Sequence, residues 1–152
     1  MSVVVNKISV AEFEAATNRN ALLDAYADEL AMDGLPHPKA KMEMYWQLEA
    51  LTKLHIFGAY LDETLIGIVN VLMAENPHYG VDIAVTESIF VFKEHRKTGA
   101  GIKLLRAAEE CAQSLGSPGI FVSAKVGSSL AAILEYNDAY VESNRTFFRK
   151  FK

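Results

Sequence analysis

The spacing of apolar residues divides the 152-residue chain into segments with strand-like and helix-like periods. The β-branched stretch 2–10 predicts a first strand. Over 11–54, apolar residues recur every three or four positions, which is typical of helices. The glycine and prolines of 34–38 cannot continue a helix, so we expect two helices on either side of them.

The rest of the chain predicts a sheet interrupted by helices. Segments 55–61 and 65–73 indicate a hairpin around 62–64, and 81–92 a long strand buried on both faces. A helix over 102–115, a strand over 119–126, a helix over 128–136 and a terminal strand or hairpin over 139–151 should follow. Without a repeat or a linker-like stretch, residues 1–152 are expected to form a single domain of the mixed α/β class.

Composition narrows the functional classes. With 51% hydrophobic and 22% charged residues, the chain is not expected to be disordered. No apolar run is long enough for a membrane span, the start lacks the order of a signal peptide, and the single cysteine, Cys111, excludes an internal disulfide. A core position for Cys111, a cytoplasmic location and no membrane partner are therefore expected. The net charge of -4 argues against nucleic acid as a partner.

Positive charge is concentrated in one region of this acidic chain. A third of the 15 lysines and arginines fall within 93–106. Such a cluster fits either a local anion site or a solvated helix face. Its members are Lys93, Arg96, Lys97, Lys103 and Arg106.

The segment 89–102 lies where the buried strand gives way to a helix, and it carries the strongest chemical signal. Gly99 and Gly101 allow close approach of a ligand to the backbone, and the first amides of the next helix have no intrahelical acceptor. Together these features predict a phosphate cradle. A Walker loop is excluded by the residues after Gly101, and a dinucleotide fingerprint by Leu104.

The pattern that fits is R-x-x-G-x-G, spanning Arg96 to Gly101, after the strand Ile89-Phe-Val91 and before Leu104-Leu105. It resembles the acetyl-CoA-binding motif of the GNAT superfamily of N-acetyltransferases, and the order of elements matches over essentially the whole chain. The resemblance implies a mostly antiparallel central sheet with a V-shaped splay, flanked by helices. It also implies acetyl-CoA as acyl donor and direct attack by a primary amine.

The same resemblance assigns the donor-binding residues. The backbone of Ile89, Phe90 and Val91 would hold the pantetheine arm, and the Val91 amide would stabilise the oxyanion. The charges of Arg96 and Lys97 and the amides of the following loop would surround the pyrophosphate. The loop residues are Lys97, Thr98, Gly99, Ala100, Gly101 and Ile102. A homodimer through 145–151 is a further possibility that relatives suggest.

The catalytic residues are less well defined. Many relatives carry a tyrosine general acid at the position of Glu135, whereas Tyr136 lies one residue later, about 100° around a helix. Tyr136 therefore has two interpretations, general acid or packing at a helix end. Glu87 is the best candidate for the general base, with the same side-chain parity as Ile89 and Val91. A solvated carboxylate is the alternative.

Other candidates are weaker. Asp82 resembles Glu87 in chemistry, and His78 and Tyr79 lie in a loop that could overhang the cleft. No His, Cys, Asp and Glu cluster has metal-ligand spacing, so no metal is expected. The helical region 11–54 should form the acceptor pocket, with acidic and aromatic side chains suited to a cationic small-molecule or peptide amine. These side chains are Asp28, Asp33, Glu43, Glu49, Tyr45 and Trp46.

Three functions remain open. The first is an acyl-CoA-dependent N-acyltransferase that transfers acetyl from acetyl-CoA to a primary amine. The second is a catalytically idle CoA-binding domain that acts as a sensor or assembly module, which the displaced tyrosine keeps open. The third is an unrelated phosphate-binding interaction domain.

Overall fold

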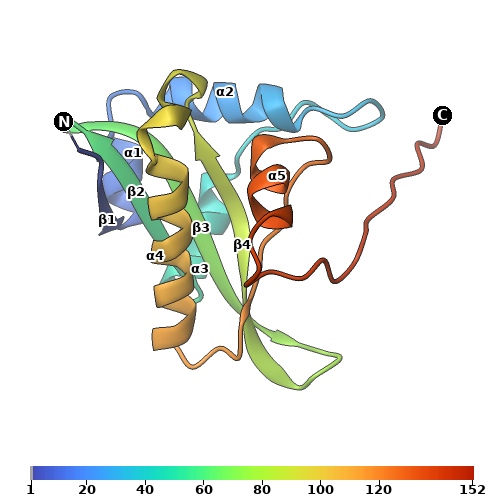
Figure 1. The fold of residues 1–152 in the computed structure, drawn as a ribbon. Helices are drawn as coiled ribbons and strands as arrows, with labels where there is room; N and C mark the ends of the chain where they lie inside the picture. Colours follow the sequence, from blue (N-terminus) through green and yellow to red (C-terminus); the bar gives the residue numbers. More distant parts are fainter. Residues whose placement is uncertain (1) are drawn as a thin grey trace.

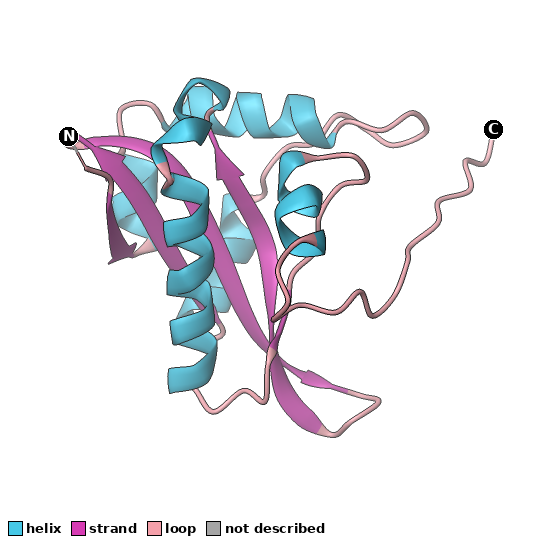
Figure 2. Cartoon of the chain, in the orientation of Figure 1, coloured by secondary structure: helices cyan, strands magenta, loops and turns pink. Residues whose placement is uncertain are grey.

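The computed structural model describes residues 2–152, which form a twisted sheet with helices on both faces (Figure 1, Figure 2). Helix α4 crosses one face, α1 and α3 lie on the other, and α2 runs along the end of the sheet. The strands are β1 (Val4–Ile8), β2 (Leu54–Leu61), β3 (Thr64–Asn76), β4 (Val81–Val91) and β5 (Ile120–Phe121). The helices are α1 (Val10–Ala15), α2 (Arg19–Leu30), α3 (Met42–Ala50), the short 3-10 helix η1 (Lys93–Thr98), α4 (Ala100–Ser114) and α5 (Ser129–Glu135).

The strands follow one another in the order β1-β2-β3-β4-β5. The first four pair antiparallel, and β4 pairs parallel with β5. Only two residue pairs join β4 to β5, Ala84 with Ile120 and Val85 with Phe121. Beyond Val85, the edge of β4 that faces away from β3 has no strand partner among residues 2–152. The predicted mixed α/β class, with a mostly antiparallel sheet and a splay, is confirmed.

Two hydrophobic clusters stabilise the two faces of the sheet. The first packs α4 on the sheet through the fully buried Leu104 and Ala108 against Val69 and Val71. Cys111 belongs to this cluster, as predicted, and burial raises the pKa of its thiol. The second cluster packs α1, α2 and α3 on the opposite face and includes Phe13, Leu22, Ile56, Ile68 and Phe90.

Local signals explain where several elements begin and turn. Ser9 and Glu12 form a capping box that starts α1 directly after β1. The β2–β3 turn uses Asp62 and Glu63 with φ of 49° and 65°, so the predicted hairpin forms without a glycine. Both residues adopt the left-handed conformation that this tight turn needs.

Several boundary predictions were wrong. The first strand ends at Ile8 because Ser9 caps a helix, and 11–54 holds most of three helices rather than two. The strand expected over 119–126 contains two paired residues. Residues 137–152 form neither strand nor hairpin, because no described strand pairs with them. Among the described residues, no helix is both long enough and apolar enough to cross a membrane.

Candidate functional site

A β-bulge lies in the middle of β4, where the register with β3 shifts. Asn70 pairs with Ser88, whereas its neighbour Val71 pairs with Thr86, so Glu87 is the extra residue. The bulge follows Val85, the last residue of β4 paired with β5, by two positions. Glu87 therefore lies where β4 begins to run free of β5.

The Glu87 carboxylate accepts hydrogen bonds from three elements of the fold. The Tyr45 hydroxyl of α3 donates to Oε1 at 2.7 Å. The Asn70 amide of β3 donates to Oε2 at 3.0 Å, and the Ser88 hydroxyl donates to the same oxygen at 2.8 Å. These donors fix the orientation of an exposed carboxylate, as the positioning of a reactive or binding group requires.

Because of the bulge, the side chain of Glu87 does not share a sheet face with Ile89 and Val91, contrary to the prediction from the sequence. Ile89 and Val91 pack against the cluster under α4, whereas Glu87 bonds Tyr45 on the opposite face. The alternation of side chains along a strand assumes no extra residue, and the bulge supplies one. Glu87 is therefore directed away from α4 and toward the layer of α2 and α3.

Two tyrosines beside Glu87 have perturbed acidity. Burial, followed by the charge of Glu87, raises the pKa of Tyr26 to about 12. Burial and the hydrogen bond to Glu87 raise the pKa of Tyr45 well above its ordinary value. Both phenols therefore stay protonated at neutral pH, and Tyr45 acts as a hydrogen-bond donor to the carboxylate.

A pocket of about 980 Å³ opens above this carboxylate. Glu87, Ser88 and Asn70 from the sheet line it, together with Tyr26 and Tyr45 from the helices. Most of its remaining lining residues are apolar, and several of these belong to or pack on the second hydrophobic cluster. The apolar lining includes Phe13, Leu23, Met42, Ile56 and Ile68.

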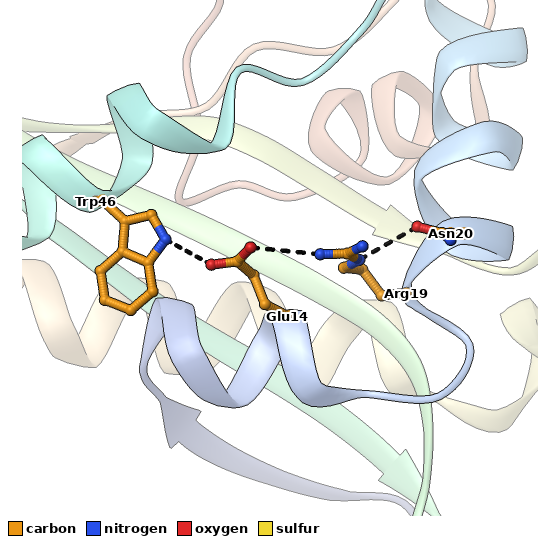
Figure 3. A network of polar contacts seen from close by, with 4 residues as sticks. All are labelled: Glu14, Arg19, Asn20 and Trp46. Atoms are coloured by element: carbon orange, nitrogen blue, oxygen red, sulfur yellow. Dashed lines mark hydrogen bonds and ion pairs between the residues drawn. The ribbon is translucent and has the colours of Figure 1, made fainter.

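A polar network joins the helices that enclose the pocket (Figure 3). Glu14 of α1 accepts one hydrogen bond from the Trp46 indole of α3 and one, at 3.4 Å, from Arg19 of α2. Arg19 also donates to Asn20 at 3.2 Å. Because Arg19 and Asn20 line the pocket, the network fixes the side of the pocket where α2 begins.

The segment predicted to form an anion cradle lies at the start of α4. Gly99 has a φ of 85° and precedes the helix, and the first backbone bond of the helix runs from Lys103 N to Gly99 O. The amides of Gly101 and Ile102 precede that bond and have no intrahelical acceptor. A Cβ built on Gly99 or Gly101 meets no atom within 4 Å, so the loop is open to a ligand.

The free edge of β4 continues from this cradle toward the bulge. Phe92 N donates to Ile66 O, which makes these two residues a hydrogen-bonded pair. Antiparallel pairs alternate, so the amides and carbonyls of Val91 and Ile89 face away from β3, whereas those of Phe90 face β3. Ile89 and Val91 are thus the residues whose backbone faces the splay.

Two of the predicted phosphate-binding cations have structural partners. Arg96 Nε donates to Val91 O at 2.9 Å, and the guanidinium pairs with Glu29 and lies over the Phe90 ring. Lys103 Nζ donates to Val3 O at 2.7 Å. Lys93, Lys97 and Arg106 are exposed, so the charge available to an anion comes from these three residues.

The structure does not bring every candidate to the pocket. Tyr136 follows α5, is 88% exposed and does not line the pocket. His78, Tyr79 and Asp82 lie outside the lining as well. Of the acidic and aromatic residues expected there, only Tyr45 lines the pocket. Within residues 2–152, no group of three or more His, Cys, Asp and Glu side chains could hold a metal ion.

Sequence reasoning missed Tyr26, Asn70 and Ser88. Asn70 left a signal, because it is one polar residue inside the apolar run of β3. A buried polar residue in such a run usually has a hydrogen-bond partner, here Glu87. Tyr26 followed the helical period of α2 and could not be separated from ordinary core residues.

Solved structures show the same fold. The ribosomal-protein-alanine N-acetyltransferase from Brucella melitensis biovar Abortus 2308 aligns with a TM-score of 0.73 at 17% identity, over 98% of this chain and 99% of that one. An aminoglycoside acetyltransferase from an uncultured soil metagenomic sample, in complex with trehalose, aligns with a TM-score of 0.72 at 16% identity. The alignment covers 99% of this chain and 97% of that one. AAC(6')-Iy with a bisubstrate CoA analogue aligns with a TM-score of 0.71 at 15% identity. The alignment covers 100% of this chain and 99% of that one.

A search of curated proteins found no significant match. A sequence model of the acetyltransferase (GNAT) family matches residues 19–137, which include α2, α3, the bulge in β4, α4 and α5. The resemblance noted in the sequence is therefore confirmed, and this chain belongs to the GNAT family of acetyltransferases.

Proposed function

We propose that this protein transfers an acetyl group from acetyl-CoA to a primary amine by direct attack. The observation that carries the proposal is the position of Glu87. Its carboxylate lies on the floor of the pocket and, along β4, directly beyond the last residue pair with β5. One carboxylate is thus placed between a pocket for an acceptor and a strand edge for a donor.

The donor would bind along the start of α4 and the free edge of β4. The amides of Gly101 and Ile102, with the dipole of α4, suit the pyrophosphate, and exposed Lys97 adds a charge. The outward amide and carbonyl of Ile89 suit the amides of the pantetheine arm, whereas the Val91 carbonyl already accepts a hydrogen bond from Arg96. The family's common use of acetyl-CoA supports this assignment, as does the bisubstrate CoA analogue bound by AAC(6')-Iy.

The chemical step would need one base and one oxyanion donor. Glu87 takes a proton from the ammonium form of the acceptor, directly or through water. The neutral nitrogen then attacks the thioester carbonyl carbon, and the Val91 amide stabilises the oxyanion. The attacking nitrogen loses one further proton to water as the intermediate collapses. Collapse breaks the C–S bond and releases the amide product and the CoA thiolate, which takes up a proton.

Tyr136 stays the predicted source of that proton. Its side chain is 88% exposed and does not line the pocket, so the role requires α5 to turn toward the splay when the donor binds. Tyr136→Phe with an accepted amine tests it. A lower kcat assigns the acid role to Tyr136, and an unchanged kcat leaves protonation of the thiolate to water.

A catalytically idle CoA-binding domain is the alternative, supported by the exposure of Tyr136. Thiol release from acetyl-CoA, measured with a panel of primary amines, separates the two functions. Amine-dependent thiol release supports the transferase. Binding of acetyl-CoA without thiol release for any amine in the panel supports the idle domain.

The expected homodimer is proposed on the terminal arm, residues 141–152, which follows Tyr140. Tyr140 is tied to α4 by a 2.6 Å hydrogen bond to Glu109. Beyond it, the arm leaves the helices without forming a helix or strand (Figure 1). Val141 and Phe147 are 86% and 88% exposed. Apolar side chains on an extended segment favour association, and a second copy would cover them.

A further inference from the structure

We propose that the acceptor is a primary amine with a single positive charge on an apolar body, not a polycation. This inference rests on the proposed transferase function and names the substrate class of the same pocket. Three features of the pocket carry it: the number of free hydrogen-bond acceptors on its floor, the balance of charge in its lining, and its apolar wall.

The floor of the pocket has acceptors for one amino group. A carboxylate has about four lone-pair sites, and three donors already occupy sites on Glu87. One site on Oε1 is left. The second acceptor is Asn70 Oδ1, which is buried without a hydrogen-bond partner in the described chain, although Asn70 lines the pocket.

Asn70 is only 6% exposed, and its amide nitrogen is committed to Glu87. A buried carbonyl oxygen without a donor costs free energy, which a donor from the ligand would offset. An amine presents at least two N–H groups when it is primary. One would reach Glu87 and the other Asn70, so these two residues recognise one primary amino group.

The lining offers few carboxylates to a cationic ligand. Asp24 and Glu87 are its carboxylates. Its basic residues are Lys39, Arg19, which pairs with Glu14 outside the lining, and His37, which lies 3.7 Å from Asp28. Glu87 is needed for the reacting amino group, which leaves Asp24 as the single carboxylate for any further cation. Lys39, which has no ion-pair partner among residues 2–152, would repel additional ammonium groups. An acceptor with several ammonium groups therefore has poor charge complementarity here.

Much of the lining around this small polar floor is apolar. Phe13, Ile56 and Ile68 form an almost fully buried part of it. Leu30 of α2, which is 41% exposed, adds accessible apolar surface. Leu23 and Met42 pack on the second hydrophobic cluster and complete the wall. A hydrocarbon or aromatic body would bury apolar surface against it, whereas hydroxylated sugar rings would leave their polar groups without partners.

Acetylation by the full-length protein tests the inference with phenethylamine, sisomicin and a hexapeptide with a free N-terminal alanine as probes. We expect kcat/KM for phenethylamine to exceed that for the other two by at least about tenfold. An equal or higher value for sisomicin or the peptide would overturn the substrate class and leave the transferase function standing.

Direct binding separates failure of the substrate class from failure of catalysis. Calorimetric titration of the CoA complex with phenethylamine should show saturable binding. Binding without turnover would support the pocket assignment and contradict the transferase function. The absence of both binding and turnover with phenethylamine would overturn the inference.

A matched pair of variants locates the effect. Leu23→Asp adds a carboxylate to the apolar wall, whereas Leu35→Asp adds one at an exposed position outside the lining. We expect Leu23→Asp to reduce the preference for phenethylamine over sisomicin at least about tenfold, with acetyl-CoA affinity and melting temperature as the checks on folding. Leu35→Asp should leave the preference unchanged. An unchanged preference in a folded Leu23→Asp variant would contradict the proposed apolar wall.

Discussion

The hydroxyl of Tyr45 donates a 2.7 Å hydrogen bond to the carboxylate of Glu87, across 42 positions of sequence. Tyr45 lies on α3 and Glu87 at the bulge of β4, so this bond joins the helical wall of the pocket to its floor. Because Tyr45 is held protonated by its raised pKa, it serves as a donor throughout the physiological range. The position of α3 thus orients the proposed base.

Removing the charge of Glu87 should affect turnover far more than donor binding. We expect Glu87→Gln to lower kcat by about 10²–10⁴-fold, the usual contribution of a general base. Its affinity for acetyl-CoA should stay within a few-fold of the wild type, because the cradle lies elsewhere. Glu75→Gln, an exposed carboxylate near the far end of β3, is the control. Wild-type kcat in Glu87→Gln would remove the carboxylate from the mechanism.

The pKa of Tyr26, which lies beside Glu87, tests the position of the Glu87 carboxylate without a substrate. Glu87→Gln should lower the pKa of Tyr26 below about 12, because it removes the second cause of the shift. Burial, the first cause, remains and should hold the pKa above the ordinary 10.0. NMR of ring-labelled tyrosine follows the titration, with the Tyr26 signal assigned from Tyr26→Phe. An unshifted pKa would mean that Glu87 does not lie beside Tyr26.

The same raised pKa sets a pH window for stability. The folded state holds Tyr26 protonated up to about pH 12, whereas an unfolded tyrosine ionises near 10. Its contribution to stability is therefore complete below pH 10 and is lost as the pH rises toward 12. Urea unfolding measures the free energy of unfolding at pH 9 and at pH 11. The decrease between these two pH values should be smaller for Tyr26→Phe than for the wild type. Equal differences in the two proteins would contradict this linkage.

A carboxylate in the cradle should prevent donor binding without unfolding the protein. Gly101→Glu places its side chain in open space, and an acidic residue is favoured in the first turn of a helix. Two charges about 4 Å apart repel by roughly 4 kcal/mol at an effective dielectric of 20, which is close to a thousandfold in affinity. Calorimetric titration with acetyl-CoA measures the loss.

Gly119→Glu is the matched control for that variant. It makes the same change at an equally open glycine beyond the other end of α4, about 22 Å along the helix axis. Its acetyl-CoA affinity should equal that of the wild type. If Gly101→Glu binds as well as Gly119→Glu, the cradle is not the pyrophosphate site.

The terminal arm can be tested by removing it. Truncation after Tyr140 keeps the bond to Glu109 and deletes the exposed apolar residues, so it should convert a dimer into a monomer. Sedimentation equilibrium of the full chain should give twice 16.8 kDa. Lys53→Glu, a charge change at an exposed residue outside the arm, should remain dimeric. A monomeric full chain would contradict the proposed interface.

The parts of the site that depend on local sequence could be predicted, and the parts that depend on register could not. Gly99 and Gly101 carry their signal in spacing, so the turn that starts α4 could be located from the sequence, and its role as a phosphate cradle stays a prediction. The side-chain direction of Glu87 was inferred from the regular alternation of side chains along a strand. The bulge at Glu87 reverses that alternation, and nothing in the composition of β4 marks the bulge. Asn70 and Tyr26 reach Glu87 only through tertiary packing. The terminal strand or hairpin predicted over 139–151 was wrong for a related reason. Its β-branched and aromatic residues favour a strand only where a partner strand exists.

Arg96 and Lys97 were predicted to act alike, and the structure separates them into testable roles. Arg96 joins η1 to the Val91 carbonyl and to Glu29, and it covers the Phe90 ring. Lys97 is exposed beside the cradle and has no ion-pair partner among the described residues. The neighbouring cations should therefore contribute to different properties, folding stability for Arg96 and donor affinity for Lys97.

We expect Arg96→Gln to lower the melting temperature by about 2–6 °C, the result of losing roughly 1–2 kcal/mol in a chain of this size. Lys97→Gln should leave the melting temperature unchanged and weaken acetyl-CoA binding by about three- to tenfold, with a smaller loss at high salt because exposed charges are screened. Differential scanning calorimetry and titration at two salt concentrations measure both properties. If Lys97→Gln destabilises the fold while Arg96→Gln weakens only donor binding, the two roles are reversed, and Arg96 rather than Lys97 contacts the phosphate.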